Sequence, residues 1–160
     1  MQQQEQHCAT DPEQLESQLR GLFHQQLHMV LATHDGAAPY TSLMAFAATA
    51  DLSSLVFVTS RATHKYSNMA ANNQVSALID NRTNRNADFQ SALAVTALGQ
   101  VREPQGKERD DLLALFLQRH PELEPFCLAP SSAFMALMVS RYILVGRFDE
   151  VHLLDVATIA

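Results

Sequence analysis

Two long stretches of the chain repeat apolar residues at intervals of three and four. Residues 11–26 begin with an Asp-Pro pair, which is typical of a helix start, and residues 105–119 repeat the same spacing. The apolar positions are Leu15, Leu19, Leu22, Phe23, Leu112, Leu113, Phe116 and Leu117. We predict an amphipathic helix over each stretch, packing one face on a core.

Short runs of apolar and β-branched residues, separated by polar turns, fill most of the remaining chain. Such runs predict strands, and Asp35-Gly36 is placed for a tight turn between the first two. The runs are residues 28–33, 40–48, 54–59, 75–80, 92–101, 134–139, 142–148 and 151–156. A shorter helix is predicted over residues 63–72, with Thr63 as N-cap and an end at Asn72-Asn73, because Asn tolerates the left-handed conformation.

The order of these elements predicts an α+β fold that is mainly antiparallel β. Six to eight short strands form a closed or nearly closed barrel with peripheral helices, and residues 81–89 and a proline-containing stretch after residue 119 are loops. A parallel doubly wound sheet is disfavoured because its strand-helix alternation and its glycine-rich first turn are missing. We expect a flexible tail over residues 1–10 and one domain over residues 11–160.

Composition narrows the classes of function. With 160 residues, 47% of them hydrophobic, the chain has enough apolar material for one packed core. Its net charge of −6 argues against nucleic-acid binding, and it contains neither an apolar run of membrane-spanning length nor a signal peptide. We expect a soluble cytoplasmic protein with no metal site, in which Cys8 and Cys127 are free thiols.

Positive charge gathers in one part of this acidic chain. No Lys or Arg occurs between Gly21 and Ser60, and a cationic segment of residues 59–65, Thr-Ser-Arg-Ala-Thr-His-Lys, then separates a strand from a helix. Its hydroxyls, its two cations and the free N–H groups of a helix start are suited to bind a phosphomonoester. The alternative is that Thr63 only caps the helix, while Arg61 and Lys65 are solvated.

Five motifs in one order carry a family resemblance. They are Leu31-Ala32-Thr33-His34-Asp35-Gly36, Pro39-Tyr40-Thr41-Ser42, Leu55-Val56-Phe57-Val58-Thr59-Ser60, Thr63-His64-Lys65 and Asn72-Asn73-Gln74-Val75-Ser76. The chain resembles the FMN-binding split-barrel family of pyridoxamine 5'-phosphate oxidase-like proteins over residues 28–99, and more loosely over residues 142–156.

The resemblance implies a split β-barrel homodimer with FMN at the subunit interface. Ser42, Leu43 and Met44 would lie along the isoalloxazine, although the basic residue usual in this strand of the family is missing here. Asn81 and Arg82 are further candidates, for the ring or for the flavin of the neighbouring subunit. The residues that would hold the phosphate and ribityl chain are Thr59, Ser60, Arg61, Thr63, His64 and Lys65.

The resemblance favours an FMN-dependent oxidoreductase acting on an unknown small molecule, in which the flavin carries the chemistry. Genuine pyridoxamine 5'-phosphate oxidase activity is not expected, because the C-terminal Arg-x-His of that enzyme is matched only by Arg147-Phe148-Asp149. Two alternatives stay open: a haem-binding protein on the same barrel, and a non-catalytic flavin binder. The histidines outside the cationic segment show no ligand spacing, and we read them as structural or surface residues.

Overall fold

The computed structural model describes residues 11–147 and 150–159. The tail predicted over residues 1–10, with Cys8, lies outside the described residues, and so do Phe148 and Asp149 of the Arg147 motif.

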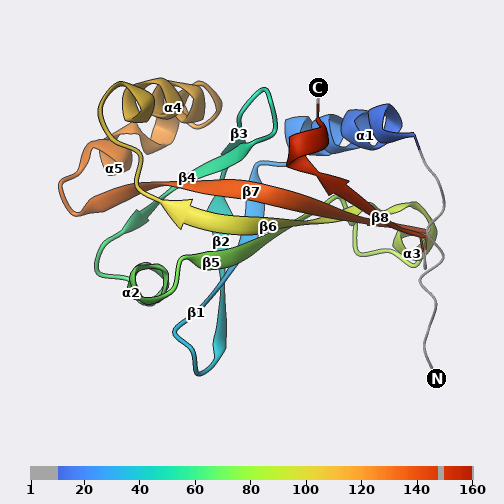
Figure 1. Ribbon diagram of the computed structural model, residues 1–160, viewed down its shortest axis with the longest axis horizontal. Coiled ribbons are helices and arrows are strands. Elements are labelled where there is room, and N and C mark those ends of the chain that lie inside the picture. The colour runs from blue at the N-terminus through green and yellow to red at the C-terminus, as the bar shows by residue number, and fades with distance from the viewer. Residues whose placement is uncertain (1–10, 148–149, 160) are drawn as a thin grey trace.

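The described strands form one antiparallel sheet, which confirms the predicted α+β split barrel (Figure 1). Its order is β2-β1-β5-β6-β7-β4-β3, with β8 paired to β7. Only Phe46 separates β2 from β3 in the chain, so the two ends of the sheet lie close and the sheet curls into a half-open barrel. The strands are β1 (His28–His34), β2 (Pro39–Ala45), β3 (Ala47–Ala48), β4 (Ser54–Ser60), β5 (Gln74–Asp80), β6 (Ala94–Arg102), β7 (Ser132–Gly146) and β8 (Glu150–Asp155).

All three predicted helices are present, as α1 (Pro12–Gln25), α2 (His64–Ala71) and α4 (Gly106–Arg119). The helix predicted to end in a left-handed asparagine ends differently, because Asn72 is extended with φ −145° and its Oδ1 accepts a hydrogen bond from Gln74 N at 2.9 Å. The turn at Gly36 is confirmed by its φ of +101°. No described helix is both long and apolar enough to cross a membrane.

The two stretches predicted as loops also contain helix, which corrects the sequence analysis. The polar loop runs into α3 (Asp88–Ser91), and the proline-containing stretch folds into η1 (Pro121–Leu123) and α5 (Glu124–Leu128). Prolines at the first helical positions are compatible with a helix, because the N–H that proline lacks has no partner there. As a result Cys127 is a buried free thiol in α5, and burial raises its pKa.

The inner face of the sheet holds the main core. Leu19 and Phe23 of α1 pack into the curl with inward residues of the strands, and Met69 of α2 joins the same core. Tyr142 is fully buried there and donates a hydrogen bond to Leu52 O at 2.7 Å. Helices α1 and α2 therefore pack on this core from opposite ends of the sheet, and the β4–α2 connection lies at the end where α2 sits (Figure 1).

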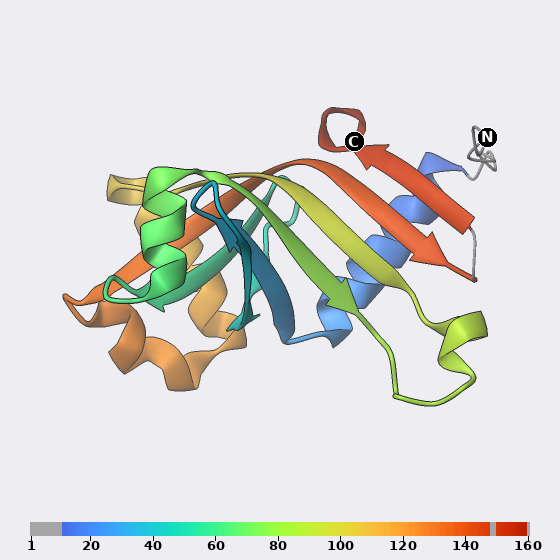
Figure 2. The ribbon, with the colours of Figure 1, turned by 90° about the horizontal axis from the view of Figure 1, so that it is seen from below.

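The outer face of the sheet has two parts, which we call the covered half and the open half. The covered half is β4 with the first part of β7, where Val58 and Phe134 are buried against Phe116 of α4. The open half is β1, β5, β6, the last part of β7, and β8, and none of the described helices packs over it (Figure 2).

The two predicted strands 134–139 and 142–148 are in fact the single strand β7. Its polar Ser140-Arg141 pair suggested a break, but it lies where β7 passes from the covered half to the open half. There the pairing of β6 with β7 shifts register between Leu98 and Gly99. A Cβ on Gly99 would lie 2.0 Å from Met138 O, so the close backbone approach at this bulge requires glycine.

Candidate functional site

The cationic segment connects the end of β4 to the start of α2. Thr59 and Ser60 end β4, where they pair with Ala133 and Ser132 of β7, and Arg61 N donates to Ser131 O at 2.8 Å. Thr63 is the N-cap of α2. The sheet thus fixes one side of the segment, and the positive end of an eight-residue helix forms the other.

Two of the hydroxyls predicted to bind phosphate are used within the segment. Thr63 Oγ1 donates to Ser60 O at 2.8 Å, so in its 3.1 Å contact with Thr59 Oγ1 the proton comes from Thr59. Thr63 Oγ1 also accepts a hydrogen bond from Tyr66 N at 3.4 Å. Thr59 and Thr63 therefore shape the segment, and both of their hydroxyl protons are already donated within the protein.

Arg61 is held by a neighbouring carboxylate. Its Nη1 and Nη2 each donate to Glu103 at 2.7 Å, and Nη1 also lies 2.6 Å from the hydroxyl of Tyr66. Tyr66 in turn donates to Glu103 at 2.7 Å. The hydrogen bonds from Arg61 lower the pKa of Glu103, and the bond to Glu103 raises the pKa of Tyr66. The guanidinium is thus neutralised by Glu103 in this structure.

Other donors of the segment have no partner among the residues that the structure describes. Lys65 is half-buried and makes neither an ion pair nor a side-chain hydrogen bond with any described residue. The backbone N–H groups of His64 and Lys65 likewise find no acceptor in the part of the chain that the structure describes. The Ser60 hydroxyl accepts from Ala62 N at 3.2 Å and keeps its own proton. One cation, one hydroxyl and two helix N–H groups fit a phosphomonoester.

Strand β2 runs beside the segment. The ring of Tyr40 stacks on the imidazole of His64, with 4.8 Å between centroids and 19° between planes. Beyond Tyr40 the strand continues through Ser42, which is half-buried, Leu43, whose side chain is 71% exposed, and the buried Met44. The structure therefore brings the predicted β2 residues and the cationic segment to the same edge of the barrel.

Asn81 and Arg82 lie elsewhere. They follow β5, which begins next to the end of α2 and runs about 20 Å away from it at the usual rise of a strand. Asn81 Oδ1 accepts from Leu93 N at 2.8 Å, and Arg82 lies 3.2 Å from Asp80. Within one protomer, these two residues and the cationic segment cannot contact one phosphate.

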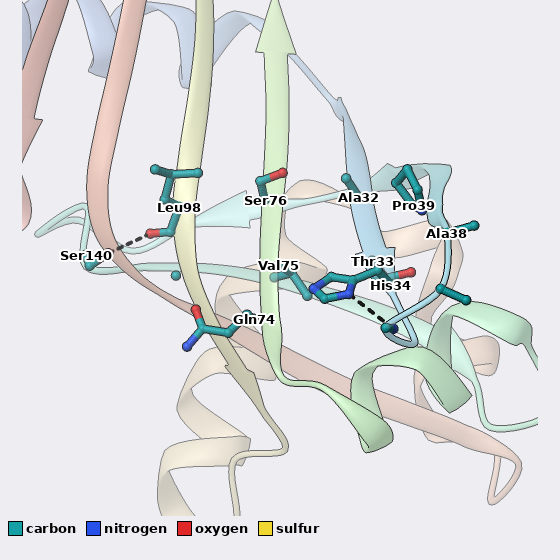
Figure 3. Close-up of a pocket in the computed structure, with 13 residues that line it drawn as sticks. Ala32, Thr33, His34, Ala38, Pro39, Gln74, Val75, Ser76, Leu98 and Ser140 are labelled. Carbon is teal, nitrogen blue, oxygen red and sulfur yellow. Dashed lines mark hydrogen bonds between the residues drawn. The ribbon is translucent and has the colours of Figure 1, made fainter.

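A cavity of about 620 Å³ lies on the outer face and not at the cationic segment (Figure 3). Its floor is formed by Ala32, Ser76 and Leu98 on three neighbouring strands, and the β1–β2 turn forms a wall. Polar lining comes from uncharged groups such as Gln74 and Ser140, and none of its described lining residues is an acid, a lysine or an arginine. This cavity therefore suits an uncharged group and not a phosphate.

Two histidines read as structural or surface residues have defined partners. His120 is buried, and its Nε2 donates to Phe46 O at 2.8 Å, which joins the end of α4 to the β2–β3 connection. His34 lines the cavity, with Nε2 3.0 Å from Asn72 Nδ2 and Nδ1 3.3 Å from Gly36 N. Within residues 11–147 and 150–159, no three His, Cys, Asp or Glu side chains gather as a metal site would require.

Sequence reasoning missed Tyr66 and Glu103 as residues of the site. Tyr66 directly follows the segment in the sequence, at the start of the predicted helix, so its proximity to the segment could have identified it. Glu103 is 42 residues from Arg61, and the two meet only because β6 and β4 both pair with β7. No local pattern in the sequence marks that contact.

Comparisons with known proteins agree with this architecture. A family model described as "Pyridoxamine 5'-phosphate oxidase" matches residues 15–153. No curated protein matches the sequence.

Several solved structures share the fold. A haem-binding protein from Mycobacterium smegmatis superimposes with a TM-score of 0.77 at 18% identity, covering 86% of this chain and 56% of that one. A haem storage protein from Vibrio cholerae gives a TM-score of 0.70 at 18% identity, over 82% and 94% of the chains. An FAD-binding protein from Mesorhizobium loti gives 0.61 at 18% identity, over 80% and 91%. The chain spans little more than half of the mycobacterial protein.

Proposed function

Because the chain belongs to the pyridoxamine 5'-phosphate oxidase family, we propose that it binds FMN, with the phosphate at the cationic segment and β2 along the ring. The observation that carries this proposal is the set of open donors at the start of α2. Lys65, the Ser60 hydroxyl and the backbone N–H groups of His64 and Lys65 point to an anionic ligand, because none of them is satisfied by a described residue.

The roles within the segment differ. Lys65 supplies the charge that meets the phosphate, and the helix start supplies directed N–H donors. Thr59 and Thr63 hold the loop in shape, His64 is fixed by its stack on Tyr40, and Arg61 lies at the rim with Glu103. Ser42, Leu43 and Met44 offer the edge of β2 to the flavin ring.

The open half supports the homodimer. A mostly apolar row crosses it in register, in which Leu43 is 71% exposed, Leu153 is 38% exposed and the other members are half-buried. The row is Leu43, Val30, Leu78, Thr96, Ile143 and Leu153. Apolar rows of this kind normally need a partner surface. In a dimer through the open half, Asn81 and Arg82 serve the flavin of the other subunit.

We propose that the protein is a flavin-dependent oxidoreductase acting on a small molecule. FMN, when bound, supplies the hydride and electron transfer. The chain contributes binding and orientation, and the uncharged cavity on the outer face is suited to the uncharged part of a substrate. A flavin store without turnover differs from this enzyme only in its response to a reductant.

Haem binding is the second candidate, and His34 in the 620 Å³ cavity is the observation that favours it. The imidazole is the kind of ligand that haem iron takes. Flavin binding is favoured over it because both nitrogens of His34 already lie within hydrogen-bonding distance of Asn72 and Gly36. If the purified protein showed a Soret band, and if that band disappeared in His34→Ala, haem binding would be favoured over flavin binding.

Titration of the protein with FMN and with riboflavin, which lacks the phosphate, tests the proposal. We expect FMN to bind at least tenfold more tightly, because a charge-assisted hydrogen bond contributes about 1.5–3 kcal/mol. Equal affinities would reject the phosphate site. Anaerobic addition of NADH or NADPH then separates the two flavin readings: bleaching of the flavin band identifies an enzyme, and a lasting yellow colour indicates a store.

A further inference from the structure

Charge at the cationic segment is set by three side chains. Arg61 and Lys65 are cations, and Glu103 is the carboxylate that forms hydrogen bonds with the segment. Glu103 binds Arg61 through both of its oxygens, while Lys65 has no ion-pair partner among the described residues. The segment therefore presents about one uncompensated side-chain charge to a ligand, although its sequence contains two cations.

We propose that Glu103 restrains the affinity of this site for phosphate, because it holds and neutralises Arg61 and leaves Lys65 as the cation open to the ligand. The inference rests on the proposed function. It reverses the simple expectation for a residue at a binding site, because loss of the Glu103 charge tightens binding instead of weakening it.

The surroundings of Glu103 keep its charge in place. The Tyr66 hydroxyl donates to Glu103 at 2.7 Å, so the carboxylate is bonded from α2 as well as from Arg61. Its side chain is 28% exposed, and Arg61 is 43% exposed. Water and salt therefore screen the effect of Glu103 only in part, and we expect a moderate change in affinity.

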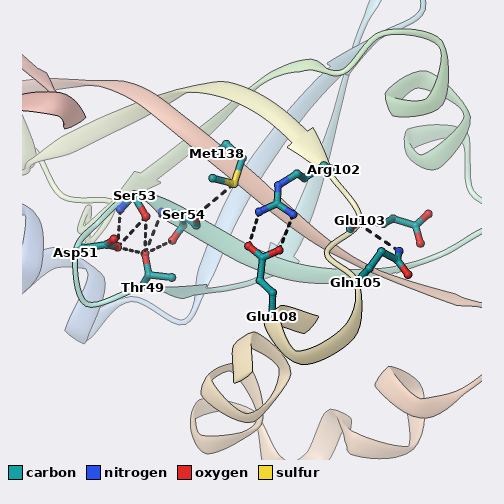
Figure 4. A network of polar contacts seen from close by, with 9 residues as sticks. All are labelled: Thr49, Asp51, Ser53, Ser54, Arg102, Glu103, Gln105, Glu108 and Met138. Atoms are coloured by element: carbon teal, nitrogen blue, oxygen red, sulfur yellow. Dashed lines mark hydrogen bonds and ion pairs between the residues drawn. The ribbon is translucent and has the colours of Figure 1, made fainter. Parts of the chain in front are cut away.

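A neighbouring ion pair provides a matched control. Arg102 and Glu108 also form a two-bond pair, and Figure 4 shows Glu103 pointing away from it although Arg102 is the adjacent residue. Glu108→Gln removes the same charge from the same kind of pair. Glu108 has no hydrogen bond to the cationic segment.

The test compares Glu103→Gln, Glu108→Gln and the unmodified protein in titrations with FMN and riboflavin. Glutamine keeps the size of the side chain and removes its charge. We expect Glu103→Gln to bind FMN about fivefold more tightly at low salt, with riboflavin affinity unchanged and the gain reduced at high salt. Glu108→Gln should match the unmodified protein with both ligands. Glu103→Ala, which removes both hydrogen bonds between Arg61 and Glu103, should change FMN affinity in the same direction.

Two results would overturn the inference. Weaker FMN binding by Glu103→Gln would mean that Glu103 presents Arg61 to the phosphate, and unchanged binding would mean that its charge does not reach the ligand. Failure of the proposed function is seen separately, because the unmodified protein would then bind FMN and riboflavin equally, and the inference would fall with it.

Discussion

The covered and open halves of the sheet's outer face share only strand β7 and are completed in different ways. Val58 and Phe134 of the covered half are buried under Phe116 of α4. In the open half, the outward-facing Leu78 and Ile143 are only half-buried, and none of the described helices covers them. One half is thus completed by the chain itself, and the other is available to a second molecule.

The burial pattern along strand β7 reflects the difference between the covered and the open half. From Ser132 to Leu137 each residue is buried, as in a strand covered on both faces, whereas from Ser140 onward exposed or half-exposed residues recur. The change occurs next to the bulge at Gly99. A continuous apolar run therefore marks covered strand, and a mixed pattern marks the open half, where a partner subunit or ligand has access.

The covered half should be the more sensitive to loss of packing. Phe116 is 0% exposed and contacts the rings of His120 and Phe134. Phe116→Ala should lower the free energy of unfolding by about 3–5 kcal/mol, because it leaves a large cavity. Urea unfolding followed by circular dichroism measures the change. Leu128→Ala, at a 58% exposed position of α5, is the control and should cost far less.

A substitution in the open half should weaken dimer formation and leave the fold unchanged. Ile143→Asp places a charge in the middle of the apolar row, and we expect the dissociation constant of the dimer to rise at least about 100-fold. Analytical ultracentrifugation over a concentration series measures it, with Leu128→Asp on the covered side as control. An unmodified protein that sediments as a monomer would reject the assignment of the open half as a dimer interface.

The bulge between the two halves should tolerate no side chain. Gly99→Ala would bring a Cβ to 2.0 Å from Met138 O, and because that oxygen belongs to the backbone, the strands must move apart. We expect a loss of about 2 kcal/mol, the usual scale for overpacking. Thermal unfolding measures it, and Gly21→Ala, where nothing lies within 4 Å of the new Cβ, should not destabilise the protein.

The smallest expected effect concerns pH and the Arg61–Glu103 pair beside the covered half. Arg61 lowers the pKa of Glu103 below its ordinary 4.5, so the ionised carboxylate stabilises the fold above that pH. This contribution, less than about 1 kcal/mol for a partly exposed pair, is lost as the pH falls through the lowered pKa. The difference in stability between the unmodified protein and Glu103→Gln should therefore shrink from pH 7 to pH 3. A difference that stays constant would contradict this assignment.

Most of the fold follows from local pattern. Helices α1, α2 and α4 and nearly all strands were predictable, because each buries one face at a regular spacing. The helical turns around Pro121 and Pro125 were not, because proline reads as a loop signal unless its place in the first turn is known. The continuity of β7 was also missed, because the bulge at Ser140 depends on pairing with β6.

The site was predictable in location and less so in detail. The segment between β4 and α2 was visible because cations and hydroxyls gather there. Sequence could not reveal that Thr59 and Thr63 bond each other, or that Arg61 is bound by Glu103. Both facts depend on tertiary geometry, and together they leave Lys65 as the central cation.

The most direct test of the account measures FMN affinity in Lys65→Ala and in Arg61→Ala. We predict that Lys65→Ala weakens binding at least tenfold, the loss of a charge-assisted bond, while Arg61→Ala has a smaller effect because its guanidinium is already bound by Glu103. Lys107→Ala, which removes an exposed cation paired with Asp111, should leave affinity unchanged. Unaltered FMN binding by Lys65→Ala would contradict the account.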